Sequence, residues 1–461
     1  MQPPAETNWP TNRTEIPGRT VVLIGASIRS AAQSAKLASF RVLGIDQFGD
    51  IDTREACEHF WELDEFSSNP EFLTHCRRFP VLTVGGLNSH RSLVESLEKS
   101  CAAWPSAHPP SAHPPSAHPP SARRWESRWD DPQWLADLSH ACDLKFPTTL
   151  QMTDSADRPL SLEGGRWLRK SRNSSGGLGV RWNTACLPHT TSLFNGNVIQ
   201  ETECRKPTTM DESATSGNHD PNAPPPNAVL QRWIAGRVHG ATLICNGTDS
   251  RLLGVCRSLF TRKSGLPFVY RGSFGPVSLP TDLTSRLQRL GKRVVAETGW
   301  RGLLNIDFLI DRQGVAWILE LNPRWSGSSE VIEQWMLERK QTTSLFGTVA
   351  GAICGNSLES FDQCSAIHPS SAGHLYLKRI IFARRKVCFS RQQLMPIINQ
   401  HDQLCDYPLD GSWIPKGNPI CTLVSRVPRT EFNLQASSGT QKSPVLTHRA
   451  SLLRLLETLE R

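Results

Sequence analysis

The sequence predicts an α/β protein of about three domains, and three observations lead to this fold class. The chain has 461 residues, and a domain takes up about 150 residues on average. The N-terminal part alternates short apolar runs, glycines and helix-forming segments, a pattern typical of parallel strands joined by crossover helices. The later part carries apolar runs separated by turn residues, a pattern typical of antiparallel strands.

Composition narrows the class of protein further. Hydrophobic residues make up 38% and charged residues 20% of the chain, and its 33 prolines and 32 glycines indicate that part of the length is unstructured. No apolar run approaches the roughly 18 residues of a membrane-spanning helix, and the polar N-terminus has no apolar secretion segment. The 13 cysteines are odd in number and form no C-x-x-C pair, which argues against a disulfide framework and a zinc ribbon. We therefore expect a soluble, cytoplasmic protein.

The distribution of charge along the sequence indicates whether nucleic acid or a membrane is an expected partner. The formal net charge is +8, from 51 basic and 43 acidic residues, and the excess is spread along the chain apart from short clusters such as the one within residues 378–386. A basic surface can bind nucleic acid or another anion, but the sequence has no zinc-finger, RRM or helix-turn-helix signature. A solvated surface is the favoured interpretation, so we expect neither nucleic acid nor a membrane as a partner.

The first elements predict a domain with a parallel sheet over residues 19–130, after a disordered leader at 1–18. Each predicted strand is short and apolar and is followed by a glycine or a polar turn, as buried strands are. The pattern predicts strands at Thr20–Ile24, Phe40–Asp46 and Val81–Val84, and a helix at Ser30–Ala38.

Two low-complexity segments interrupt this order. Residues 106–120 repeat the sequence SAHPP three times, and proline at two positions in five excludes a helix or a central strand. We interpret residues 105–122 as an extended spacer. A metal site formed by the histidines of the repeat is the alternative, but in polyproline II five residues span about 15 Å and the imidazoles diverge. Residues 188–227 are polar and proline-rich, and predict a long surface insertion.

The rest of the chain predicts two further regions. Asp131 and Pro132 open a helix with an acidic first turn, and strand-like runs return after Val229, so we expect a second domain over residues 131–346. Residues 347–461 predict a small, mainly β module with a tail. Its strand candidates are His374–Ile381 and Ile420–Val424.

Two acidic residues lie inside apolar runs on either side of a hairpin turn at Asp311–Gly314. A carboxylate in such a run is costly unless it is paired or bound to a metal. Counting outward from the turn puts Asp307 and Glu320 on neighbouring antiparallel strands and on the same face, and Asn322 shares that face by alternation. Three oxygen ligands on one face suit Mg²⁺ bridging nucleotide phosphates. An accidental pair of strand acids, one of them bound to Arg324, is the less favoured alternative.

A lysine followed by a loop of small residues suggests a phosphate site. Lys170 ends a short apolar run and precedes a loop rich in serine and glycine. The backbone N–H groups of such a loop can approach phosphate oxygens while the lysine supplies positive charge. The order differs from the Walker A loop, in which the lysine comes last. The residues of this loop that we expect to contact phosphates are Ser174, Ser175, Gly176, Gly177 and Gly179.

A third segment, Val229–Arg237, is an apolar strand that enters a turn with a glycine. Its backbone could present hydrogen-bonding groups to an adenine edge. Taken alone, the segment is equally well explained as an ordinary strand end.

These segments, in this order, resemble the ATP-grasp superfamily, most clearly from Trp167 to Glu330. The resemblance implies that Lys170 holds the inner phosphates and that the loop from Ser174 to Gly179 closes over the triphosphate. It implies that Gln231, Trp233 and Ile234 belong to the adenine hinge. It also implies that Asp307, Glu320 and Asn322 bind Mg²⁺ (or Mn²⁺), and that Arg324 acts in catalysis, with Lys170, by steadying the transferred phosphoryl group.

The same resemblance implies the architecture and the activity. The N-terminal region is similar to a Rossmann-like pre-ATP-grasp domain, followed by a two-lobed ATP-grasp domain and a C-terminal β module. The carboligases related to biotin carboxylase and to tyramine–glutamate ligase are the most similar subgroup. The implied function is an ATP-dependent ligase that joins a small-molecule carboxylate to an amine (or thiol) through an acyl phosphate, with a homodimer left open.

Three alternatives stay open or are disfavoured at this point. A biotin-carboxylase-like carboligase and an ATP-binding protein without catalysis remain open. A dinucleotide-binding enzyme is disfavoured, because Gly25 is the only glycine in the first turn although Asp46 follows at a suitable distance. One departure from the family also stands out: a second nucleotide-binding lysine is expected near Asp131, but Pro132 follows there, and Lys145 lies just before a Phe-Pro pair.

Overall fold

The computed structural model describes residues 19–68, 70–87, 90–104, 127–151, 165–171, 174–183, 228–358, 373–394 and 402–428. The predicted leader, the SAHPP spacer, the polar insertion and the C-terminal tail lie outside the described residues. Within the described ranges, no helix is long and apolar enough to cross a membrane.

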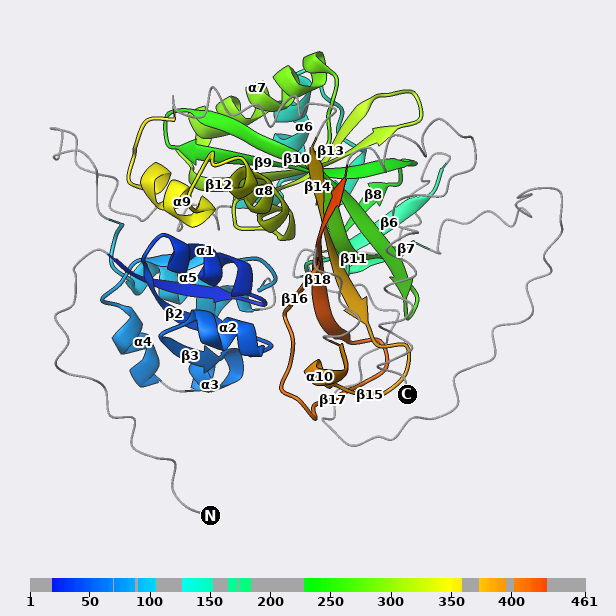
Figure 1. The fold of residues 1–461 in the computed structure, drawn as a ribbon. Helices are drawn as coiled ribbons and strands as arrows, with labels where there is room; N and C mark the ends of the chain where they lie inside the picture. Colours follow the sequence, from blue (N-terminus) through cyan, green and yellow to red (C-terminus); the bar gives the residue numbers. More distant parts are fainter. Residues whose placement is uncertain are drawn as a thin grey trace, which may run out of the picture.

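The N-terminal domain is a parallel four-stranded sheet with helices packed against it (Figure 1). The strand order is β3-β2-β1-β4, and β1 pairs in parallel with both β2 and β4. The residues of β1 alternate between two apolar clusters: Val21 and Leu23 belong to one, and Val22 and Ile24 belong to the other. The reason is that alternate side chains of a strand point to opposite faces. The predicted strands and helix are confirmed. The strands are β1 (Thr20–Gly25), β2 (Arg41–Asp46), β3 (His59–Glu62) and β4 (Val81–Thr83), and the helices are α1 (Arg29–Leu37), α2 (Ile51–Ala56), α3 (Leu63–Ser68), α4 (Pro70–Cys76) and α5 (Arg91–Ser100).

A large antiparallel sheet forms the centre of the molecule, with the order β13-β12-β9-β10-β11-β14-β18-β16. Its first five strands in this order are β13 (Ala316–Asn322), β12 (Arg301–Asp311), β9 (Gly236–Asn246), β10 (Ser250–Lys263) and β11 (Leu266–Gly275). Leu243 packs in the cluster that contains α7 (Thr281–Thr298), whereas the next residue, Ile244, packs in the cluster with α8 (Gly327–Glu338) and α9 (Leu345–Ile353). The helices therefore cover opposite faces of this sheet (Figure 1).

The C-terminal strands join the same sheet. The predicted strand regions correspond to β14 (His374–Phe382) and β18 (Pro419–Pro428), and β16 (Asp402–Cys405) pairs at the edge. The junction between β11 and β14 depends on Gly272, which has φ +137° and on which a Cβ would lie 2.1 Å from the Lys378 carbonyl oxygen. Only glycine fits this close approach. β15 (Val387–Cys388) and β17 (Trp413–Ile414) form a separate pair, which shares a small apolar core with β14 and β18, and Phe389 is fully buried in this core.

A second, smaller antiparallel sheet has the order β5-β8-β6-β7. Its strands are β5 (Thr149–Gln151), β6 (Trp167–Ser171), β7 (Val180–Trp182) and β8 (Ala228–Arg232). The preceding helix α6 (Pro132–His140) begins where predicted, because the side chain of Asp131 caps it by accepting from the Gln133 N–H. A turn of 3₁₀ helix, Ser127–Asp130, comes before α6 and brings Trp129 against Trp300 at the end of α7. The small sheet contacts the large one through β7 and β11.

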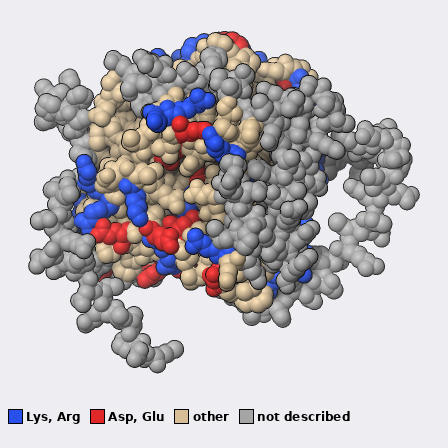
Figure 2. All heavy atoms as spheres, in the orientation of Figure 1, with Lys and Arg blue, Asp and Glu red and all other residues tan. Residues whose placement is uncertain are grey.

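Acidic and basic side chains alternate over the face of the molecule that Figure 2 shows, and they do not separate into one basic region there. Exposed ion pairs such as Arg54 with Glu62 illustrate the pattern. The surplus of positive charge therefore does not collect on the visible part of this face.

Candidate active site

The predicted acidic pair lies on the β12–β13 hairpin. The register pairs Asp307 with Glu320 and Asn305 with Asn322, so the predicted common face is confirmed. A shift in register after Asp307 leaves Leu319 as an extra residue, and this bulge brings both Leu319 and Glu320 to the cavity. The Asn322 Nδ2 donates to Asp307 Oδ2 and to Glu320 Oε1, both at 3.0 Å. The amide thus holds two carboxylates together.

The electrostatics of the pair favour a bound cation. Burial and the neighbouring Glu320 raise the pKa of Asp307 well above its usual range. Desolvation within the cavity would raise the pKa of Glu320 as well, but the Lys170 ammonium and hydrogen bonds from Asp307 and Asn322 lower it. Two like charges this close repel, and a divalent cation with oxygen ligands would relieve that repulsion.

The residues present fit Mg²⁺ if the nucleotide completes the ligand set. No group of three or more His, Cys, Asp and Glu side chains that could hold a metal occurs in the described part of the chain. The remaining ligands of a cation at Asp307 and Glu320 must therefore be the Asn322 amide oxygen, phosphate oxygens and water. Asn322 Oδ1 accepts from Arg324 Nη2 at 2.9 Å, so the amide would have to turn to serve as a ligand. The metal role of these three residues stays a prediction.

Lys170 lies on β6 opposite this acidic pair and lines the same cavity. Burial lowers the pKa of Lys170, although Glu320 and Asp307 act in the opposite direction. A partly desolvated lysine is suited to bind an anion such as a phosphate, because a nearby negative charge stabilises the ammonium form that burial disfavours.

The glycine loop is docked on β11. Gly176 and Gly177 have φ values of +62° and +80° and line the cavity. The Tyr270 N–H donates to the Gly176 carbonyl oxygen at 2.9 Å, and a Cβ on Gly177 would lie 1.8 Å from the Phe268 carbonyl oxygen. Glycine at this position therefore lets the loop approach the opposite wall of the site.

The other predicted loop residues take different places. Ser174 and Ser175 border a neighbouring pocket of about 170 Å³ that shares Lys170 and Glu320 with the main cavity. Gly179 lines neither pocket; its carbonyl oxygen accepts from the Ser171 N–H at 3.0 Å and closes the turn. A side chain at Gly179 would collide with Ser174 Oγ, which is 1.8 Å from the Cβ position.

The predicted adenine hinge lines the other end of the main cavity, which has a volume of about 340 Å³. Gln231 is buried, and its Nε2 donates to Thr149 Oγ1 at 3.0 Å. The Trp233 N–H donates to the Arg166 carbonyl oxygen at 2.8 Å, and the Trp233 ring packs edge-on against Trp182. Ile234 follows Trp233 along the lining. The lining of this one cavity thus combines the apolar side chains of Trp233 and Ile234 with the charged groups of Asp307, Glu320 and Lys170.

Several lining residues were not predicted. The β10–β11 hairpin contributes Phe260, Phe268 and Tyr270 to the lining. In the sequence, this hairpin has only the pattern of ordinary strands. Asn305 donates from Nδ2 to Asp307 Oδ1 at 2.8 Å, and the alternation that led from Glu320 to Asn322 would have found it. Ser326, Gly327 and Ser328, at the start of α8, also line the cavity.

Among the described residues, no second lysine lines the cavity. Lys145 has its backbone paired with β13 next to Trp317 and lies outside the residues that line the cavity. The cations of the described lining are Lys170, Arg232 and Arg324.

Comparison with known proteins agrees with the fold. Residues 133–328 match the model of the ATP-grasp domain. This part of the chain thus matches the family that the resemblance implied.

An uncharacterized protein of Methanocaldococcus jannaschii is 25% identical over 199 residues, which are 43% of this chain and 42% of that protein. The chain thus spans less than half the length of this curated relative.

Solved structures with the same fold cover nearly the whole chain. The carboxyaminoimidazole ribonucleotide synthase of Aspergillus clavatus, complexed with ATP, has a TM-score of 0.57 at 11% identity, covering 96% of this chain and 99% of that one. The L-amino acid ligase of Bacillus licheniformis has a TM-score of 0.55 at 11% identity, covering 95% and 97%. The biotin carboxylase domain of the Hydrogenobacter thermophilus 2-oxoglutarate carboxylase, with MgADP and bicarbonate, has a TM-score of 0.55 at 12% identity, covering 89% and 86%. At these identities the likeness concerns the fold.

Proposed function

We propose that this protein is an ATP- and Mg²⁺-dependent ligase that joins a small-molecule carboxylate to an amine (or thiol) through an acyl phosphate. The observation that carries the proposal is the charged end of the cavity, where Asp307 and Glu320 face Lys170 beneath a glycine loop. Positive groups and metal ligands gathered in one part of a cavity that also has apolar and aromatic walls suit a nucleotide whose phosphates lie at the charged part.

Each part of ATP has a matching set of residues. Gln231, Trp233 and Ile234 would hold the adenine at the apolar end. Lys170 and the loop of Ser174, Ser175, Gly176, Gly177 and Gly179 would hold the phosphates. Asp307, Glu320 and Asn322 would hold Mg²⁺, or Mn²⁺ with the same oxygen ligands, and the metal would neutralise charge on the outer phosphates.

The chemistry follows from the position of these charges. An oxygen of the substrate carboxylate attacks the γ-phosphorus, and the bond from that phosphorus to the β-phosphate oxygen breaks, which yields an acyl phosphate and ADP. Arg324 and Lys170 offset the negative charge that develops on the transferred phosphoryl group. The amine then attacks the acyl carbon, phosphate leaves with the electrons of the C–O bond, and the amine loses a proton to water.

The relatives' own chemistry supports this reaction class. By their names, the similar structures include an L-amino acid ligase and a biotin carboxylase domain bound to MgADP and bicarbonate. For this protein we propose the reaction class of the ligase, which joins a carboxylate to an amine. The described site does not define the substrate. The ten cysteines that the structure describes are all free, which supports a reducing compartment such as the cytoplasm.

A hydroxamate screen tests the proposal. The purified protein is incubated with Mg-ATP, hydroxylamine and a panel of carboxylates, and hydroxamate and ADP are measured. We expect hydroxamate from at least one carboxylate with an equal amount of ADP, since hydroxylamine is a small nucleophile that intercepts activated acyl groups. ATP use that depends on bicarbonate and biotin, with no hydroxamate from any organic acid, would instead indicate a biotin-carboxylase-like enzyme. Binding of ATP without turnover under all conditions would indicate a non-catalytic ATP-binding protein.

A further inference from the structure

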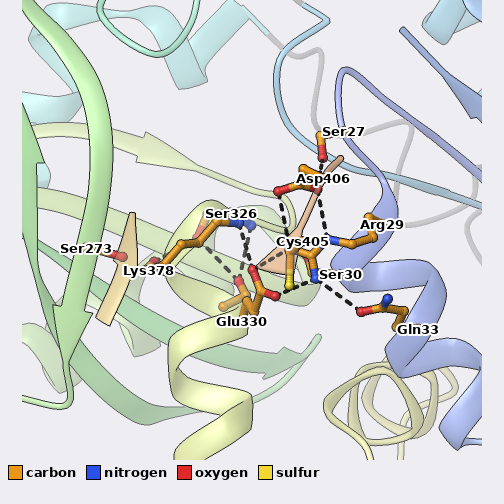
Figure 3. Close-up of polar contacts among 12 residues, drawn as sticks. Ser27, Arg29, Ser30, Gln33, Ser273, Ser326, Glu330, Lys378, Cys405 and Asp406 are labelled. Carbon is orange, nitrogen blue, oxygen red and sulfur yellow. Dashed lines mark hydrogen bonds and ion pairs between the residues drawn. The ribbon is translucent and has the colours of Figure 1, made fainter. Parts of the chain in front are cut away.

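A buried cluster of charged side chains joins four separate segments of the chain next to the candidate active site (Figure 3). Arg29 begins α1 of the N-terminal domain, Glu330 lies on α8, Lys378 lies on β14, and Asp406 follows β16. Arg29 is 1% exposed and Glu330 3%. Figure 3 shows that Arg29 and Lys378 both point toward Glu330.

Arg29 uses its whole guanidinium group in this cluster. Its Nη1 and Nη2 donate to Glu330 Oε1 and Oε2 at 2.5 and 2.9 Å. Its Nε and Nη2 donate to the two carboxylate oxygens of Asp406 at 2.8 and 3.3 Å, and Nη1 also donates to Gln33 Oε1 at 3.1 Å. Two bidentate contacts fix both the distance and the angle between the partners.

The remaining partners tie the cluster to the rest of the fold. Lys378 Nζ lies 2.7 Å from Glu330 Oε2, and the Asp406 N–H donates to Asp52 Oδ2 at 2.9 Å. Burial would raise the pKa of Glu330, but Arg29 and Lys378 lower it, so the carboxylate stays charged. An apolar contact of equal volume would be about as stable as a buried ion pair. What the ion pairs add is a defined orientation of α8.

The orientation of α8 matters because its first turn belongs to the nucleotide cavity. Ser326, Gly327 and Ser328 line that cavity, and Glu330 lies within one helical turn of them. Ser326 caps the helix through a reciprocal contact with Ser329. The first N–H groups of a helix have no partner within the helix, and they carry a partial positive charge. They therefore form a binding surface for an anion at the charged end of the cavity.

The first turn of α8 also contacts Tyr270, which is connected to Lys378 of the cluster. Lys378 is paired in the sheet with Ser273, whose Oγ accepts from the Tyr270 hydroxyl at 3.2 Å. Tyr270 lines the cavity, and its hydroxyl oxygen lies 2.8 Å from where a Cβ on Gly327 would be. The first turn of α8 is thus held between Tyr270 on one side and the Arg29–Glu330 contact on the other.

We propose that Arg29 is a positioning residue for phosphoryl transfer: through Glu330 it fixes the first turn of α8 as the binding surface for the transferred phosphoryl group. The N-terminal domain thereby controls the outer-phosphate end of the site without touching the nucleotide. The inference rests on the proposed function. Adenine and the inner phosphates are held by β6, β8 and the glycine loop, so Arg29 does not determine nucleotide affinity itself.

A binding experiment with Mg-ADP and orthovanadate, a mimic of the transferred phosphoryl group, separates an effect on the phosphoryl-binding surface from an effect on nucleotide affinity. The dissociation constant of Mg-ADP is measured by calorimetry with and without vanadate for the full-length protein and for Arg29→Lys and Glu330→Gln. Arg29→Lys keeps the charge but loses the bidentate contacts, and Glu330→Gln keeps the shape. Arg54→Gln is the matched control, because Arg54 lies in the same domain and forms its ion pair at the surface, with Glu62. Melting curves establish that each variant is folded.

The wild-type protein is expected to bind Mg-ADP at least about 10-fold more tightly with vanadate, since transition-state mimics gain affinity from groups placed for the reaction. Both cluster variants are expected to bind Mg-ADP within about threefold of wild type and to lose the vanadate effect, because misplacement of the helix by about 1 Å is enough to lose it. Arg54→Gln is expected to keep it. A folded Arg29→Lys or Glu330→Gln protein with the full vanadate effect, or a wild-type protein that binds Mg-ADP with no vanadate effect, would overturn the inference. Failure of the wild type to bind Mg-ADP at all would contradict the proposed function instead.

Discussion

Replacement of Glu320 with alanine is expected to lower ATP turnover at least about 1,000-fold, because a metal ligand that offsets phosphate charge contributes several kcal/mol to the transition state. Asp307→Ala is expected to have an effect of similar size. The fold should persist in Glu320→Ala, because the Glu320 carboxylate is exposed to the cavity and its charge is one cause of the raised pKa of Asp307. The measurement is ADP release with the carboxylate that gives a hydroxamate, together with a melting curve.

Asp282→Asn serves as the control for the loss of one acidic residue. Asp282 lies in the first turn of α7 and pairs with Arg286 at the surface, so its turnover should equal that of wild type. A folded Glu320→Ala protein that retains wild-type ATP consumption would show that the metal assignment is wrong.

Lys170→Ala is expected to weaken ATP binding by about 10- to 100-fold, the effect of losing a hydrogen bond to a charged group. Turnover should fall further, by about 100-fold or more at saturating ATP, if the lysine also offsets charge in the transition state. The loss should be large because the described lining has only Arg232 and Arg324 as other cations. Calorimetry with a non-hydrolysable ATP analogue measures the first effect, and ADP release measures the second.

Arg169→Ala is the matched control for this experiment. Arg169 precedes Lys170 on β6, and adjacent residues of a strand point to opposite faces. It does not belong to the residues that line the cavity, so its removal should leave ATP affinity within about threefold of wild type. Equal losses in the two variants would point to a general electrostatic effect and against a specific phosphate contact.

The sequence predicted the acidic end of the site because the evidence for it is local. Asp307, Glu320 and Asn322 lie on one hairpin, and the strand period of two settles which side chains share a face. The glycine loop after Lys170 was predictable for the same reason. Its contact with Phe268 and Tyr270 was not, since it depends on how a second sheet packs against the first.

The contact between Arg29 and Glu330 shows the limit of sequence reasoning most clearly. The two residues are 301 positions apart, and nothing near either one in the sequence indicates a buried partner. The sequence from Gly25 to Asp46 also resembles part of a dinucleotide-binding motif. In the structure Asp46 accepts from the N–H groups of Ile28 at 2.7 Å and of Phe48 at 2.8 Å. The carboxylate therefore stabilises the turn before α1 and the loop that follows β2.

The most direct test of the proposed reaction follows oxygen from the carboxylate. The carboxylate identified by hydroxamate formation is labelled with ¹⁸O, and the products of a reaction with Mg-ATP and an amine acceptor are examined by ³¹P NMR. The proposed mechanism predicts ADP and inorganic phosphate that carries one ¹⁸O atom from the carboxylate, because it assigns the positive groups and metal ligands to the γ-phosphate. Appearance of AMP that carries ¹⁸O, together with unlabelled pyrophosphate, would contradict it and would indicate an adenylate intermediate.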